Sequence, residues 1–234
     1  MKQDHSPVLP GDGATDYARY MRLDTLLDLQ RRPAEMLHRD ELLFQVVHQS
    51  TELWLKLAAA ELTEAVARLR AGELAATESL LARATLGIRL VTDQLEMFRH
   101  LSPADFQAMQ PALGRGSGAE SPGWRQVQGT SRQLARAFTE HLAAQGIEPA
   151  TLGRPDPADP VQRLAEALIE WDERVSLWRT RHHRVALRVG GHDPGGPEAT
   201  MLAKLAGHRF FPELWRARRK PSGAPGDEFP AGHP

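Results

Sequence analysis

Nonpolar residues recur at spacings of three and four along most of this chain, which is the period of an α-helix packed on one side against a core. The alternating pattern of half-buried strands is scarce, and so are the dipeptides typical of tight hairpins. The pattern therefore predicts helices over the ranges 21–30, 36–71, 74–100, 103–112, 123–145, 160–189 and 198–207.

Two helix starts are marked in the same way. Ser102 precedes Pro103 and so places a capping side chain before a proline in the first helical turn. Asp159 precedes Pro160 with the same spacing. The Gly- and Pro-rich stretch 190–197 ends the last long helix. Long helices joined by short connections predict an all-α fold, a helical bundle of antiparallel neighbours.

The two ends of the chain differ in composition from the rest. Residues 1–16 and 221–234 are rich in Pro, Gly and Asp, which disfavour regular structure, and we expect both segments to be flexible. Residues 17–220 are expected to form a single helical domain, because the chain of 234 residues is of a length typical for one or two domains.

The composition removes several kinds of chemistry. The chain contains no cysteine, so disulfides, iron–sulfur clusters and thiolate ligation of zinc or haem are excluded. Its 29 Lys and Arg residues nearly balance 30 Asp and Glu residues, which argues against a nucleic-acid or anionic-membrane partner. No nonpolar run approaches the roughly 20 residues of a membrane span, and no signal peptide is recognisable, so we expect a cytoplasmic protein.

Histidines interrupt two of the nonpolar stripes. In the last long helix, His182 takes a position where Leu or Val is expected, whereas His183 points about 100° away. In the first long helix, His48 lies one turn after Phe44. Such histidines are either ordinary core residues or the lining of a cofactor or substrate cavity, and the pattern leaves both interpretations open. The stripe around His182 comprises Val161, Leu164, Leu168, Trp171, Val175, Trp178, Val185 and Val189.

Five motifs, in order along the chain, resemble those of the tryptophan 2,3-dioxygenase family. The longest is DELLFQVVHQSTELWLK at 40–56, and WRTRH at 178–182 resembles the segment in which this family carries a haem ligand. Shorter matches are YARYMRLD at 17–24, LSPADF at 101–106 and FFPELW at 210–215. The resemblance therefore covers most of the chain.

The resemblance implies a b-type haem with ferrous iron, enclosed by the bundle, and O2 as co-substrate. His182 would be the axial ligand of the iron, bound through a neutral imidazole, and Trp178 would border the haem. His48 would be the catalytic distal residue, hydrogen-bonded to the N–H of an indole substrate, and Phe44 would pack on the indole ring. Ser117 would lie beside the haem, although a plain Gly/Ser turn explains its composition equally well.

The resemblance also implies residues that line the substrate from other elements. Phe106 lies on the helix that faces the substrate in this family. Tyr17, Tyr20 and Met21 would come from a neighbouring subunit and close the pocket, as in the tetramer of this family. We therefore expect a homo-oligomer, a tetramer or a dimer, that binds a small aromatic substrate.

Two anchors for the amino-acid part of tryptophan differ from the family pattern. The family has a Phe-Arg pair whose Arg binds the substrate carboxylate, whereas this chain has Met109 and Gln110. The family threonine that meets the substrate ammonium is replaced by Gly196 or Pro197, depending on a one-residue gap. The substrate is therefore expected to be tryptophan, a modified tryptophan or another 3-substituted indole.

The expected reaction is the insertion of O2 into the C2–C3 bond of an indole by a haem-dependent dioxygenase. The sequence leaves three alternatives open. One is a haem-dependent monooxygenase that forms an oxindole or a phenol, and another is a haem-binding protein without turnover. The third is a helical scaffold with structural histidines and no cofactor.

Overall fold

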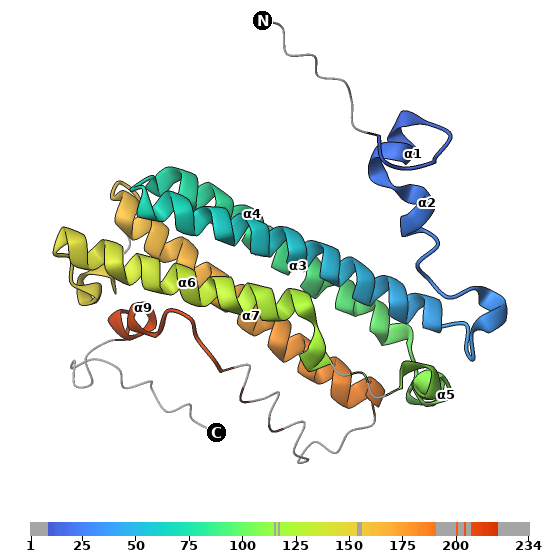
Figure 1. Ribbon diagram of the computed structural model, residues 1–234. Coiled ribbons are helices and arrows are strands. Elements are labelled where there is room, and N and C mark those ends of the chain that lie inside the picture. The colour runs from blue at the N-terminus through green and yellow to red at the C-terminus, as the bar shows by residue number, and fades with distance from the viewer. Residues whose placement is uncertain are drawn as a thin grey trace, which may run out of the picture.

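The computed structural model describes residues 9–114, 116, 118–153, 156–190, 200, 204 and 207–219. This part of the chain is helical and contains no β-strand, which confirms the all-α prediction. Four long helices run side by side as an elongated bundle (Figure 1). α3 lies against both α4 and α6, and α7 packs against α4. Their bounds are Glu41–Arg70 for α3, Leu74–Asp93 for α4, Pro122–Gln145 for α6 and Pro160–Gly190 for α7.

Shorter helices extend the bundle at its ends. α5 (Pro103–Leu113) lies at one end, and α9 (Pro212–Ala217) lies toward the other, against the 3-10 helix η4 (Pro149–Gly153) (Figure 1). α1 and α2 lie clear of the bundle near the N-terminus (Figure 1). The bounds of the remaining elements are Asp16–Met21 for α1, Leu23–Leu26 for α2, Pro33–Glu35 for η1, Gln94–His100 for η2 and Gly118–Glu120 for η3.

The N-terminal helices differ most from the prediction. The range 21–30 is not one helix, because Arg22 adopts a left-handed conformation with φ of 53° and separates α1 from α2. α3 starts later than the predicted residue 36. The carboxylate of Glu41 accepts hydrogen bonds from the backbone N–H groups of Leu37 and His38, and these bonds hold the preceding residues in a turn.

The other predicted ranges agree with the structure in most of their length. Those over 103–112, 123–145 and 160–189 are confirmed by α5, α6 and α7. The range 74–100 is α-helical only as far as Asp93 and continues as the 3-10 helix η2. Most of the range 198–207 lies outside the described residues.

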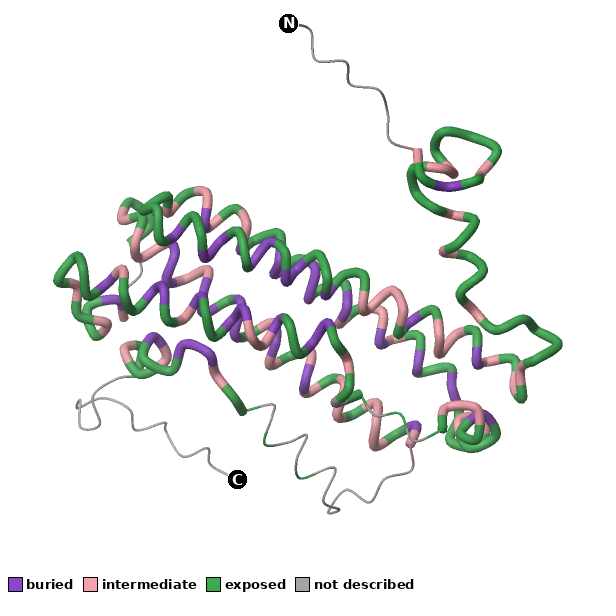
Figure 2. The backbone as a smooth tube through the Cα atoms, viewed as in Figure 1, coloured by how far each residue is buried: buried purple, intermediate pink, exposed green. Residues whose placement is uncertain are grey.

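The main core lies where the four long helices face one another, and buried positions follow their inner sides (Figure 2). Leu62, Leu134 and Leu168 are among its fully buried side chains. Trp171 of α7 is also fully buried, and its indole N–H donates to Ser131 Oγ of α6 at 3.1 Å. Burying one leucine contributes roughly 2 kcal/mol, so this core fixes how the helices lie against each other. None of the described helices has a stretch long and nonpolar enough to cross a membrane.

A buried carboxylate attaches the C-terminal segment to α7. Asp172 accepts hydrogen bonds from the backbone N–H groups of Phe210 and Phe211, at 2.8 and 3.0 Å. It also accepts one from Trp215 Nε1 at 3.1 Å. Burial raises the pKa of Asp172, against the opposing effect of these donors. The FFPELW motif is therefore an anchor for the chain after α7 has ended.

A second buried contact fixes the start of α6 against α3. Glu52 of α3 accepts hydrogen bonds from the Ser121 hydroxyl and from the backbone N–H of Gly123, the latter at 2.9 Å. A Cβ atom at position 123 would lie 2.7 Å from Glu52 Oε2 and 2.7 Å from Leu55 Cβ. Only glycine therefore allows the two helices to approach this closely.

We expect Gly123→Ala to lower the free energy of unfolding by about 1–3 kcal/mol, because the added methyl group overlaps Glu52 and Leu55. Gly129→Ala is the matched control on the same helix, since a Cβ atom there meets nothing within 4 Å. That change should stabilise the helix by roughly 0.5–1 kcal/mol. Urea unfolding followed by circular dichroism measures both, and equal effects would contradict the close approach at position 123.

Candidate active site

A second nonpolar cluster lies at the α5 end of the bundle. Three partly buried aromatic side chains pack against this cluster: Phe44 of α3, Phe106 of α5 and Trp178 of α7. The two histidines from the sequence patterns border it, since His48 contacts Phe44 and His182 contacts Trp178. Helices far apart in the sequence thus bring both imidazoles to one site. The buried members of this cluster are Val47, Leu95, Phe98, Leu101, Met109 and Val189.

The ring of His48 is held in one orientation. Its Nδ1 atom is 2.8 Å from the backbone carbonyl oxygen of Phe44, and its ring stacks on that of Phe44 with centroids 4.1 Å apart. Since a carbonyl oxygen only accepts, Nδ1 carries the proton and donates it. In the neutral ring, Nε2 is then a free hydrogen-bond acceptor.

The surroundings of His48 favour this neutral form. Part of the ring is open to solvent, yet burial among nonpolar side chains lowers its pKa, against smaller opposing effects of the Phe44 carbonyl and of nearby Glu52. Phe98 lies on another side, with its ring centroid 5.7 Å from that of His48. A neutral acceptor with aromatic neighbours suits a flat ligand that carries an N–H group.

His182 is kept neutral more strongly than His48. Burial, and to a smaller extent the nearby His48 and His183, lower its pKa from 6.5 to about 4. Within the described part of the chain, neither ring nitrogen makes a hydrogen bond. Its ring lies nearly parallel to that of Trp178, with centroids 4.9 Å apart and 13° between the planes. A neutral imidazole whose nitrogens are both unpaired can use a lone pair to bind a metal ion.

Two indole groups behind His182 carry N–H donors without acceptors. The rings of Trp124 and Trp178 have centroids 3.9 Å apart at an angle of 35°. Nε1 of each is buried and has no hydrogen-bond partner among the residues that the structure describes. Buried donors are normally paired, so these two are suited to an acceptor group on a bound ligand.

Aromatic side chains from α5 and η2 enlarge the cluster around Phe44. The Phe106 ring centroid lies 6.1 Å from that of Phe44, and the Phe98 centroid lies 5.8 Å away. Gln110 follows Phe106 by one turn of α5 and is exposed, whereas Met109 is fully buried. Gln110 therefore shares the face of Phe106, and Met109 belongs to the packed interior.

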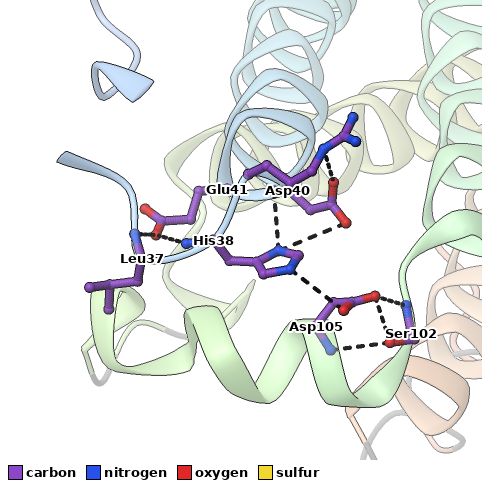
Figure 3. A network of polar contacts seen from close by, with 7 residues as sticks. Leu37, His38, Asp40, Glu41, Ser102 and Asp105 are labelled. Atoms are coloured by element: carbon purple, nitrogen blue, oxygen red, sulfur yellow. Dashed lines mark hydrogen bonds and ion pairs between the residues drawn. The ribbon is translucent and has the colours of Figure 1, made fainter. Parts of the chain in front are cut away.

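Polar contacts attach the start of α5 to the segment before α3 (Figure 3). His38 Nε2 lies 3.5 Å from Asp105 Oδ1, and His38 Nδ1 accepts a hydrogen bond from the backbone N–H of Asp40 at 3.3 Å. Asp105 also accepts hydrogen bonds from Ser102, which chiefly lower the pKa of Asp105. These contacts position Phe106, the next residue of α5, beside Phe44.

Other predicted site residues lie elsewhere. Tyr17, Tyr20 and Met21 are exposed on α1, away from the aromatic cluster of the same chain (Figure 1). Ser117 and Gly196 lie outside the described residues. No group of three or more His, Asp or Glu side chains suited to a metal ion occurs in the part of the chain that the structure describes.

Sequence reasoning missed two members of the site. Phe98 lies on η2 and Trp124 on the first turn of α6, and both are within ranges that were predicted as ordinary helix. Neither belongs to a motif with a known role. Their contacts with His48 and Trp178 depend on how separate helices pack, which no local pattern in the sequence specifies.

The low pKa of His182 predicts a pH-dependent stability for the chain without ligand. The unfolded chain binds a proton at His182 below about pH 6.5, while the folded chain does so only near pH 4, so stability is lost as the pH falls through this window. The loss should be on the order of 2–3 kcal/mol. His182→Gln should flatten this slope in urea titrations, whereas the control His183→Gln should keep it. An unchanged slope in His182→Gln would contradict the assignment.

Comparison with known proteins agrees with the motifs. The family model described as tryptophan 2,3-dioxygenase matches residues 2–138, which is more than half of the chain. A tryptophan 2,3-dioxygenase of Xanthomonas oryzae pv. oryzae is 30% identical over 91% of this chain and 92% of its own length. Those of Xanthomonas euvesicatoria pv. vesicatoria and Myxococcus xanthus are each 28% identical. They cover 92% and 93% of this chain, and 92% and 94% of their own lengths. The chain belongs to the tryptophan 2,3-dioxygenase family.

Proposed function

We propose that this protein is a haem-dependent dioxygenase that inserts O2 into the C2–C3 bond of tryptophan, a modified tryptophan or another 3-substituted indole. The observation that carries the proposal is the pair of neutral imidazoles at one end of the bundle. Neither nitrogen of His182 makes a hydrogen bond to a described residue, and His48 presents Nε2 as an acceptor among aromatic rings. One ring is suited to a metal, and the other to the N–H of an indole.

The residues around His182 fit a b-type haem. A neutral histidine is the common protein ligand of haem iron, and cysteine is absent from the chain. The unpaired indole N–H groups of Trp124 and Trp178 are suited to a carboxylate of the porphyrin. When bound, the ferrous haem supplies the binding and activation of O2. His182 would hold the iron, and the nonpolar cluster would limit the access of water.

The residues around His48 would orient the substrate. His48 Nε2 would accept the indole N–H, while the Phe44 ring, stacked on His48, would pack against the indole ring. Phe106 would close the aromatic wall from α5. Holding the indole in one orientation lowers the entropic part of the activation barrier. The same orientation would present C2 and C3 of the indole to the oxygen.

The side chain at indole C3 would meet a neutral group on α5. Gln110 stands where the family carries an arginine, and its amide cannot make a bidentate ion pair with a carboxylate. A charge-assisted hydrogen bond contributes roughly 1.5–3 kcal/mol, so its loss weakens the preference for a zwitterion. This supports a substrate range that extends from tryptophan to modified tryptophans and neutral 3-substituted indoles.

The active form would be a homo-oligomer. Tyr17 and Tyr20 are 65% and 64% exposed on a helix that lies clear of its own bundle. Leu53 and Leu57 are also exposed, one turn apart on α3. Exposed nonpolar surface of this kind is typical of a protein–protein interface. It supports the proposal that α1 lines the substrate site of a neighbouring subunit.

Turnover under ¹⁸O2 tests the proposed reaction. The protein is loaded with hemin, reduced, and supplied with tryptophan, its methyl ester, tryptamine or 3-methylindole. We expect at least one of these indoles to give a ring-opened product that carries two labelled atoms by mass spectrometry. A single labelled atom would assign a monooxygenase instead, and the absence of turnover with every indole would contradict the proposal.

The proposed hydrogen bond to His48 predicts discrimination against N1-methyl substrates. The methyl group removes the donor, so kcat/KM for the N1-methyl form of the best indole should fall by about 2- to 10-fold or more in the wild type, as expected for one neutral hydrogen bond. His48→Ala should be slower with the parent indole and should lose most of this discrimination. Equal discrimination in the variant would remove the proposed role of His48.

A further inference from the structure

We infer that Trp178 is a positioning residue that fixes the plane of the His182 imidazole, with Trp124 as its support. Trp178 precedes His182 by one turn of α7, and the two rings are within 13° of parallel with centroids 4.9 Å apart. The inference rests on the proposed function, in which His182 is the ligand of a haem iron. It gives the rings of this aromatic pair a role that is separate from the proposed contact of their N–H groups with the porphyrin.

A ligating imidazole needs some constraint on its rotation. The terminal torsion of histidine has a broad energy well, so the backbone of α7 alone does not fix the ring plane. Metal-binding histidines usually obtain this constraint from a hydrogen bond between the second ring nitrogen and a carbonyl or carboxylate group. His48 has such a bond to Phe44, but His182 has none within the described residues. Its imidazole instead stacks on the ring of Trp178.

Trp178 is itself held from behind. The Trp124 ring lies against it at 3.9 Å between centroids, and Trp124 is 92% buried. The backbone N–H of Trp124 donates to Ser121 Oγ at 3.1 Å, and the Ser121 hydroxyl donates to Glu52 of α3. A continuous series of contacts therefore runs from α3 through the start of α6 to the imidazole on α7. Such a stack resists rotation of its last ring.

The test compares Trp178→Leu with Trp178→Phe in protein loaded with hemin. Leucine removes the flat face, so the iron–imidazole stretching band of the reduced protein should shift or broaden in the resonance Raman spectrum. Hemin should leave about 10- to 100-fold faster, the range found when the outer contacts of a metal ligand are removed. Phenylalanine retains an aromatic face, so it should restore the wild-type band. It lacks the N–H proposed above to bind a porphyrin carboxylate, so the band and not the rate of hemin loss reports the positioning role in this variant.

Trp171→Phe is the matched control. Trp171 lies two turns earlier on α7, is fully buried, and donates its N–H to Ser131 Oγ rather than contacting His182. Its replacement should lower the stability of the bundle and leave the Raman band and the rate of hemin loss unchanged. If Trp171→Phe shifts the band as much as Trp178→Leu does, the effect is a general loosening of α7 and the inference is wrong.

The remaining outcomes separate this inference from the proposed function. A wild-type band and hemin-loss rate in Trp178→Leu would overturn the positioning role while leaving His182 as the ligand. If Trp178→Leu does not fold, Trp124→Leu takes its place, and an unaltered band there would likewise overturn the role. An iron–imidazole band that persists in His182→Gly would show that the proposed ligand is wrong, whatever the tryptophan variants do.

Discussion

The proposed chemistry depends on two imidazoles held among nonpolar side chains at one end of a helical bundle, where His182 is half-buried and His48 is partly open to solvent. Burial disfavours the charged form of histidine, and it lowers the pKa of both His48 and His182. At neutral pH, His182 therefore keeps a lone pair for a metal, and His48 keeps one for an N–H donor. A charged ring could serve neither purpose, so the nonpolar cluster around these residues is part of the proposed chemistry.

The fold holds these rings in place through a few specific contacts. The main core aligns α3 with α4 and α6, and α4 with α7. Glu52 and Gly123 then set the start of α6 against α3, and this brings Trp124 to the back of Trp178. Asp172 of α7 binds the backbone of Phe210 and so holds the C-terminal segment against α7. Asp172 is buried and Glu52 is half-buried, and each carboxylate accepts hydrogen bonds from named partners, which makes the packing specific as well as stable.

Much of the fold could be predicted from periodicity, because the stripe around His182 and the proline-marked starts are local signals. Periodicity does not fix every position: Trp54 is a large aromatic residue in the longest motif, yet it is 37% exposed. Arg22 breaks a predicted helix through one left-handed residue. The histidines and Phe44 could be named from motifs, whereas Phe98 and Trp124 depend on contacts between helices that no sequence pattern records.

The most direct measurement of the central claim is a titration of the purified protein with hemin, followed by absorption spectroscopy of the reduced form. We expect one haem per chain and a spectrum typical of histidine ligation. In His182→Gly that spectrum should be lost, and added imidazole should restore it. A protein that stays colourless after hemin is supplied, or a His182→Gly variant that keeps the wild-type spectrum, would contradict the account.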